Sequence, residues 1–262
     1  MNFQENQYIP INKLIENLKN ESQDPQVILL TCGNYYPIHK FHIEIFEIAK
    51  KYLEKEKNYN VVLGYISPSS ERKVNKKYPD KTISFDDRID MIKLITNKSS
   101  WIDITTWESL SPENNIDIPD YHQIIKNLSD FLNINNEVKK ALNGRELKII
   151  FLFGLDEALK KDDRNGLNDL EGYEIVIIER YINSESKKEN CEKYCKDKLS
   201  KMEMYKDVWN ILESQIIFIN CDDNFEISSG KIRELLKNND EKWKYLCHPE
   251  VVKNIEEKNI KF

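Results

Sequence analysis

The sequence predicts an α/β protein, a three-layer sandwich with a mainly parallel six-stranded sheet and helices on both faces. Short runs rich in branched apolar residues recur along the chain, each with the length of a buried strand. Several of the segments between them carry apolar residues at helical spacing. Such alternation favours parallel strands joined by right-handed crossovers.

Six segments are predicted as strands. In chain order they are QVILLTC (26–32), NVVLGYIS (60–67), WIDITTW (101–107), LKIIFLFG (147–154), YEIVIIER (173–180) and SQIIFIN (214–220). In a Rossmann-like sheet of this kind, ligands bind outside the carboxyl ends of the strands, near the point where strand order reverses. We therefore expect the functional site at that edge.

Helices are predicted between and after these strands. After Pro37, apolar residues recur at helical spacing to about Lys55, and a second helix begins after the N-cap candidate Ser84. Two helices, 229–238 and 249–258, close the chain.

We expect a single domain over residues 1–262. Residues 1–24 are predicted as an N-terminal extension. The Asn-rich segment 111–147 and the charged segment 182–213 fit the alternation poorly, and both are predicted as insertions, helical in part.

The composition excludes several classes of protein. With 39 Lys and Arg against 45 Asp and Glu, the net charge of −6 argues against general nucleic-acid binding. No apolar run approaches the ~18–20 residues of a membrane helix, and the N-terminus lacks the pattern of a signal peptide. We expect no membrane or nucleic-acid partner, and a cytoplasmic or nuclear location.

The five cysteines, at positions 32, 191, 195, 221 and 247, are odd in number and scattered, unlike a disulfide framework. Cys191 and Cys195 have no histidine or second cysteine pair to complete a zinc site. We therefore expect reduced thiols and no protein-held metal.

The segment GNYYPIHKFH (33–42) indicates a phosphate site. Gly33 directly follows a strand, and the next helix offers its positive N-terminal end. His39 and His42, three residues apart, point to roughly the same side and can donate N–H groups to phosphate. The segment lacks the later glycines of GxGxxG, and no GK[ST] of a Walker P-loop occurs in the chain. Helix capping alone is the alternative.

A second helix start, ISSGKIR (227–233), has the same chemistry. Ser228 and Ser229 are N-cap candidates, and Lys231 and Arg233 follow them. Together the two segments predict polyphosphate held between two helix N-termini.

Five motifs occur in one order: GNYYPIHKFH, ISP (66–68), TWESL (106–110), GLD (154–156) and ISSGKIR. From about residue 26 onward the chain resembles the eukaryotic nicotinamide/nicotinic acid mononucleotide adenylyltransferases, members of the HxGH nucleotidyltransferase superfamily. The resemblance implies transfer of the adenylyl group of ATP, with Mg²⁺, to nicotinamide or nicotinic acid mononucleotide. The products are NAD or deamido-NAD and pyrophosphate, formed by direct attack without a covalent enzyme intermediate.

The resemblance also implies residue roles. His42, His39 and Arg233 act in catalysis by binding the ATP phosphates. The wider ATP site comprises the motif residues Gly33, Asn34, Tyr35, His39, His42, Gly154, Asp156, Ser228, Ser229 and Arg233.

On the mononucleotide side, the resemblance implies that Trp107 stacks on the pyridine ring, with Glu108 in the same loop. A core position for Trp107 is the alternative. A lysine of the loop after Pro68 meets phosphate; Lys73, Lys76 and Lys77 are candidates, and Lys76 is favoured.

The sequence departs from the family pattern at three places. Asn34 replaces a serine, Gly230 replaces a threonine, and the segment 157–172 lacks a tryptophan that family members often carry. The last departure leaves open the preference between the amide and acid mononucleotides. The alternatives are another superfamily transferase, using pantetheine phosphate or CTP, and a non-catalytic nucleotide-binding or chaperone-like module. A homo-oligomer is possible.

Overall fold

A central parallel sheet organises the molecule. We describe it from a computed structural model of residues 7–20, 22–79, 83–111, 118–159, 166–179, 191–221 and 227–260. The sheet has six strands in the order β3-β2-β1-β4-β5-β6, and every neighbouring pair is parallel. The strands are β1 (Gln26–Gly33), β2 (Asn60–Pro68), β3 (Ile102–Ile104), β4 (Leu147–Gly154), β5 (Ile175–Glu179) and β6 (Ile216–Asn220). The predicted fold class is confirmed.

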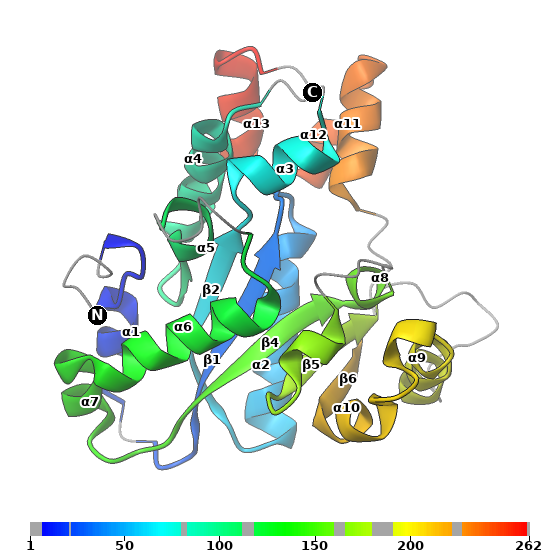
Figure 1. The fold of residues 1–262 in the computed structure, drawn as a ribbon. Coiled ribbons are helices and arrows are strands. Elements are labelled where there is room, and N and C mark those ends of the chain that lie inside the picture. Colours follow the sequence, from blue (N-terminus) through cyan, green and yellow to red (C-terminus); the bar gives the residue numbers. More distant parts are fainter. Residues whose placement is uncertain are drawn as a thin grey trace.

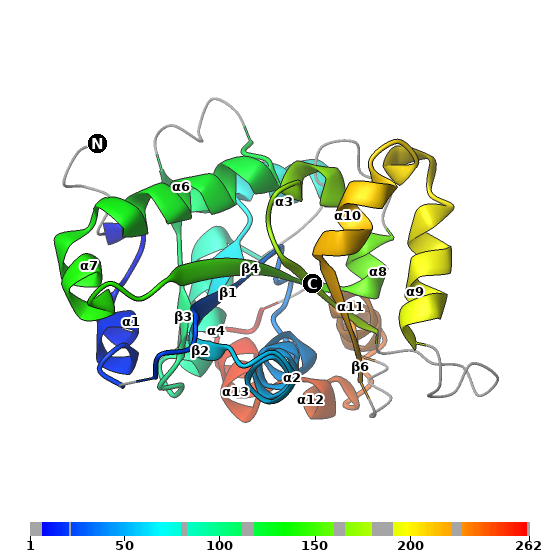
Figure 2. The same ribbon diagram turned by 90° about the horizontal axis from the view of Figure 1, so that it is seen from below.

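Helices cover both faces of this sheet (Figures 1 and 2). On one face lie α2 (Phe41–Glu56), α4 (Phe85–Thr96), α12 (Trp243–Leu246) and α13 (Pro249–Glu257). On the other lie α1 (Asn12–Asn17), α6 (Tyr121–Ile134), α7 (Asn136–Leu142), α9 (Cys191–Ser200) and α10 (Trp209–Gln215). The remaining helical segments are α3 (Glu71–Lys77), α5 (Trp107–Leu110), α8 (Leu155–Ala158), α11 (Ser229–Lys237), η3 (Leu167–Leu170) and η4 (Glu203–Tyr205).

The two hydrophobic layers follow from strand geometry. Successive side chains of a strand point to opposite faces, so Val27 and Leu29 of β1 join the layer under α2, while Ile28 and Leu30 join the layer under α6. In β2, Gly64 permits α2 to pack closely, because a Cβ there would lie 2.6 Å from Cδ1 of Phe46. All four β1 residues are fully buried, as predicted for a central parallel strand.

The predicted helix starts are confirmed where the sequence offered a cap. Ser84 precedes α4 and accepts a hydrogen bond from the Asp87 backbone N–H at 3.1 Å. The helix after Pro37 runs to Glu56, one residue beyond the expected end, and the last two predicted helices correspond to α11 and α13.

Three strand predictions were too long. The strand expected over 214–220 begins only at Ile216, because Ser214 and Gln215 belong to α10. The strand expected over 101–107 covers only Ile102–Ile104, because the Thr106 N–H donates to the Tyr8 carbonyl at 2.9 Å and α5 starts at Trp107. The strand expected over 173–180 ends by Glu179 and begins at Ile175, after a turn in which the Tyr173 N–H bonds to the Leu170 carbonyl. Position 180 lies outside the described residues.

The segments predicted as insertions contain helices. Residues 111–147 include α6 and α7, and α6 buries Ile124, Ile125 and Leu128 against the sheet. Residues 182–213 include α9, η4 and the start of α10, while 182–190 lie outside the described residues. The single-domain boundaries and the assignment of these segments as insertions stay predictions.

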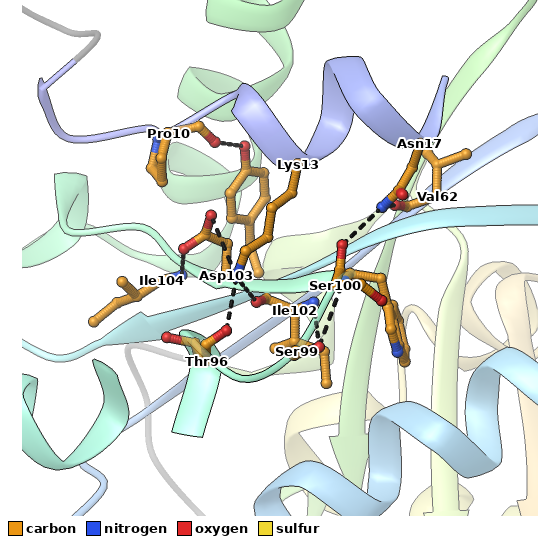
Figure 3. A network of polar contacts seen from close by, with 12 residues as sticks. Pro10, Lys13, Asn17, Val62, Thr96, Ser99, Ser100, Ile102, Asp103 and Ile104 are labelled. Carbon is orange, nitrogen blue, oxygen red and sulfur yellow. Dashed lines mark hydrogen bonds and ion pairs between the residues drawn. The ribbon is translucent and has the colours of Figure 1, made fainter. Parts of the chain in front are cut away.

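The N-terminal arm, residues 7–20, packs against β2 and β3 (Figure 3). Lys13 Nζ donates to the carbonyls of Thr96 and Ile102, each at 2.7 Å, and Asn17 Nδ2 donates to the Val62 carbonyl at 2.8 Å. Tyr65 donates its hydroxyl to the Pro10 carbonyl at 2.6 Å. The arm thereby links β2 to the neighbouring edge strand β3.

In the part of the chain that the structure describes, no helix is both long and apolar enough for a membrane span, and no three His, Cys, Asp or Glu side chains are grouped to hold a metal. The described cysteines Cys32, Cys195, Cys221 and Cys247 are not joined in disulfides. The side chain of Cys191 lies outside the described part.

Candidate functional site

A cavity of about 710 Å³ opens where β1 and β4 diverge. The two strands pair only as far as Leu30 and Phe151. The last three residues of each strand, Thr31 to Gly33 and Leu152 to Gly154, instead line the cavity. This point is the switch in strand order, since β2 and β3 lie on one side of β1 and β4 to β6 on the other. The predicted location of the ligand site therefore coincides with the cavity.

The two histidines of the first motif lie together at the start of α2 and line the cavity. Their rings stack, with centroids 3.6 Å apart and planes inclined by 17°. The backbone N–H of His39 donates to Nδ1 of His42 at 3.1 Å. Because Nδ1 is an acceptor there, a neutral His42 carries its proton on Nε2. His42 can therefore present an N–H donor from that atom.

Gly33, Asn34 and Tyr35 also line the cavity, at the end of β1. A Cβ at Gly33 would lie 3.2 Å from Cζ of the Tyr35 ring, so the glycine permits that ring to cover it. Tyr35 has the left-handed φ of 45°, and its ring meets His42 edge-on at 4.9 Å. The sequence did not predict this packing role of Gly33.

The candidate lysines lie on a helix, and the prediction of a loop after Pro68 was wrong there. Ser70 caps α3 by accepting the Lys73 N–H at 3.3 Å, which lets the seven residues form a short helix. Lys73, Lys76 and Lys77 all line the cavity. The structure thus brings three cations to the site and does not single out Lys76.

The second motif contacts the first directly, and both line the cavity. Ser228 caps α11 by accepting the Lys231 N–H at 3.1 Å, as predicted. Ser229 Oγ donates to the Pro37 carbonyl at 2.9 Å, and Arg233 Nη1 donates to the Tyr36 carbonyl at 2.5 Å. Ser228, Ser229 and Arg233 all line the cavity. Two segments nearly two hundred residues apart are thereby joined.

The GLD motif contributes a third segment to the cavity. Gly154 ends β4, Asp156 lies in α8, and both line the cavity. A Cβ at Gly154 would lie 2.6 Å from Asp156 Oδ1, so the carboxylate folds back over the glycine. Glu157 lines the cavity beside it.

Trp107 and Glu108 are not among the residues that line the cavity. Trp107 is 7% exposed and belongs to the hydrophobic layer under α6. Glu108 is 1% exposed; it accepts the Ser67 hydroxyl at 2.8 Å and lies 3.5 Å from Lys73 Nζ. Lys73 does line the cavity, so it connects Glu108 to the site.

Cys32 lies beside this buried pair. Burial raises the pKa of its thiol well above the ordinary value, and the nearby Glu108 carboxylate raises the pKa further. The thiol therefore stays protonated at neutral pH and is a poor nucleophile.

Arg88 was missed at the sequence level. It is fully buried in α4 and donates to the Asn34 carbonyl at 2.9 Å and to the Ser69 carbonyl at 3.0 and 3.1 Å. These carbonyls belong to the connections that follow β1 and β2, and both residues line the cavity. The sequence did contain a signal for the role of Arg88, because a charged residue on the apolar face of a predicted helix is unusual.

A family model described as cytidylyltransferase-like matches residues 30–235, from β1 to α11. The chain belongs to the cytidylyltransferase-like family. The match to this family includes every segment that lines the cavity.

The chain is similar to nicotinamide/nicotinic acid mononucleotide adenylyltransferase 1 of Bos taurus, with 40% identity over 93 residues, 35% of this chain and 31% of the relative. The enzyme of the same description from Schizosaccharomyces pombe is 33% identical over 110 residues, 41% of this chain and 28% of the relative. The matched region spans less than a third of either relative.

A solved structure shares the fold. The Plasmodium falciparum nicotinic acid mononucleotide adenylyltransferase complexed with NaAD superposes with a TM-score of 0.55 at 17% identity, covering 89% of this chain and 96% of that one.

Proposed function

We propose that this chain transfers the adenylyl group of ATP to nicotinamide or nicotinic acid mononucleotide, forming NAD or deamido-NAD and pyrophosphate. The observation that carries the proposal is the cavity at the switch point, bordered by the starts of α2 and α11 and by three lysines of α3. Helix N-termini and lysines both favour phosphate. The sequence similarity to two mononucleotide adenylyltransferases supports this choice of reaction.

In the proposed reaction, an oxygen of the mononucleotide 5′-phosphate forms a bond to the α-phosphorus of ATP. The bond from that phosphorus to the oxygen bridging to the β-phosphate breaks, and pyrophosphate leaves with the oxygen. Two anions must meet in line, so alignment and charge neutralisation supply most of the acceleration. No enzyme nucleophile is needed, in keeping with the protonated Cys32.

The side chains have distinct proposed tasks. His42 donates Nε2–H to the α-phosphate as negative charge develops there, and His39 holds the His42 ring by stacking. Ser228, Ser229 and Arg233 bind the leaving pyrophosphate at the start of α11. Gly33, Asn34 and Tyr35, with Gly154 and Asp156, face the nucleoside of ATP.

We place the mononucleotide beside α3. Lys76 is the proposed phosphate ligand, with Lys77 and Lys73 along the same wall. The pyridine ring lies toward Glu108, whose partner Lys73 reaches the cavity. Stacking by Trp107 stays a prediction, since its ring packs in the hydrophobic layer.

Mg²⁺ is assigned to the substrate as MgATP. Asp156 and Glu157 line the cavity, but no cluster of three His, Cys, Asp or Glu side chains occurs in the described ranges. Mg²⁺ is commonly held through substrate phosphates and water with few protein ligands. When bound to ATP, it reduces the repulsion between the two anionic substrates.

Pyrophosphate release tests the function. The purified chain is assayed with MgATP and each mononucleotide in turn, and with CTP in place of ATP. We expect release with ATP and at least one mononucleotide, and the ratio of the two rates measures base preference. Absence of release with both mononucleotides would overturn the proposal, and turnover only with CTP would indicate another transferase. The cytoplasmic or nuclear location and the homo-oligomer stay predictions.

A further inference from the structure

The Arg233 guanidinium lies against two neighbouring tyrosine rings. Its guanidinium carbon is 4.8 Å from the ring centroid of Tyr36 and 4.8 Å from that of Tyr78. The two rings are themselves 5.2 Å apart between centroids. Both tyrosines line the cavity. Cations within about 6 Å of a ring centroid are attracted by the negative face of the ring.

Tyr36 is buried, and its backbone is bonded to α11. Tyr36 is 3% exposed, and its carbonyl accepts from Arg233 Nη1 at 2.5 Å. One helical turn earlier, Ser229 Oγ bonds to the Pro37 carbonyl at 2.9 Å. The start of α11 is therefore fixed to the Tyr36–Pro37 backbone at two points.

The Tyr78 side is supplied by a different element. Tyr78 directly follows α3, whose Lys76 and Lys77 line the same cavity. Lys77 Nζ lies 5.9 Å from the Tyr78 ring centroid. Tyr78 thus contacts cations from both the proposed mononucleotide wall and the proposed ATP wall.

We propose that Tyr36 and Tyr78 are positioning residues that hold the Arg233 guanidinium at the phosphate side of the cavity. The proposal rests on the proposed function only in naming ATP as the anion. A free arginine side chain loses much rotamer freedom when it binds phosphate. A guanidinium held over ring faces keeps the N–H donors of its edge available. Its rotamer freedom is then largely lost before ATP binds, so ATP binding costs less entropy.

Replacement of Tyr78 tests this role through ATP affinity, measured by titration calorimetry. Tyr78→Ala is expected to weaken ATP binding about 5- to 10-fold, in line with a cation–π contact. Tyr78→Phe keeps the ring and is expected to bind within about twofold of the wild type. Tyr78→Leu keeps bulk without a π face and is expected to resemble Tyr78→Ala. Tyr245→Ala, at an exposed tyrosine of α12, is the control and leaves affinity unchanged.

A double-mutant cycle separates positioning from a general effect on the fold. In an Arg233→Ala background, Tyr78→Ala is expected to weaken ATP binding no further. An equal loss in that background, or a Tyr78→Phe variant as weak as Tyr78→Ala, overturns the proposal, as does unchanged affinity of Tyr78→Ala.

Titration calorimetry measures ATP affinity without turnover, so different results contradict the proposed function and the proposed role of the tyrosines. A wild-type chain that binds ATP but releases no pyrophosphate contradicts the proposed function and leaves the cycle informative. A wild-type chain that does not bind ATP contradicts both.

Discussion

At the scale of single residues, the two histidines differ in burial and in the hydrogen bond that joins them. His39 is 3% exposed, and its backbone N–H occupies Nδ1 of His42. His42 is only half-buried and faces the cavity, with its other nitrogen left to carry the proton. We therefore expect the pair to act as one oriented donor, which would account for their spacing of three residues.

Replacement of His42 is expected to remove that donor and keep the fold. His42→Ala should lower pyrophosphate release about 100-fold or more, the typical loss for a group that stabilises developing charge. Release is measured with saturating MgATP and mononucleotide, and circular dichroism checks the fold. His122→Ala, at an exposed histidine of α6, is the matched control and should retain the wild-type rate. Unchanged turnover in His42→Ala would contradict the assignment.

His248, immediately before α13, is expected to make stability depend on pH. Burial lowers the pKa of its imidazole below 6.5, Lys40 and Lys98 lower it too, and Glu250 raises it. Below about pH 6.5 the unfolded chain binds this proton more readily than the folded one. The stabilisation is therefore complete above that pH and lost as the pH falls toward the folded value.

Thermal unfolding between pH 8 and pH 5.5 measures this effect. The midpoint of the wild type should fall more steeply toward pH 5.5 than that of His248→Gln, which cannot titrate. His122→Gln is the control and should keep the wild-type slope. Parallel profiles for wild type and His248→Gln would show that this group does not contribute.

At the scale of elements, Arg88 connects a helix to the ends of two strands. It donates from α4 to carbonyls that follow β1 and β2, and it lies 3.5 Å from Glu71 of α3. The Arg88 guanidinium makes three hydrogen bonds to the two carbonyls from two nitrogens held in one plane, a geometry that a lysine ammonium does not reproduce. The walls of the cavity thus depend on a side chain that does not line it.

Arg88→Lys is expected to lower the free energy of unfolding by about 1–3 kcal/mol, because buried carbonyls lose their donors. It should also raise KM for both substrates, since both walls shift. Urea unfolding and steady-state kinetics measure the two effects. Arg72→Lys, at an exposed position of α3, is the control. A stable Arg88→Lys variant with unchanged KM would show that this geometry is not required.

At the scale of the whole molecule, the N-terminal arm is part of the core. Ile9, Leu14 and Leu18 are at most 1% exposed and belong to the layer under α6 (Figure 3 shows the polar contacts). Tyr8 supplies the carbonyl that ends the β3 pairing just before Trp107. The arm therefore stabilises the corner that carries the TWESL motif.

Lys13→Met tests the polar part of this docking. The variant keeps an aliphatic chain but leaves the Thr96 and Ile102 carbonyls without their donor, so we expect a loss of about 1–3 kcal/mol in unfolding free energy. Lys19→Met is the control, because that side chain is 65% exposed and its ion pair with Glu16 contributes little. Chemical unfolding compares them, and equal stabilities would contradict the prediction.

Much of the architecture was predictable because its signals are local. The buried run of β1, the caps Ser84 and Ser228, and the helical spacing of α2 each depend on neighbouring residues in the chain. The extent of β3 was not predictable, because its pairing ends at Tyr8, almost a hundred residues earlier. The helix α3 was missed because its only strong signal is the cap of a seven-residue segment.

By itself, the sequence determined the order and type of the main elements, and it predicted a phosphate site at two segments. Only the tertiary structure decided how they form one site. The cavity exists because β1 and β4 stop pairing at Leu30 and Phe151. The packing of Trp107 in a hydrophobic layer and of Arg233 against Tyr36 and Tyr78 depends on distances between remote segments. Spacing along the chain does not contain those distances, because packing and burial determine them.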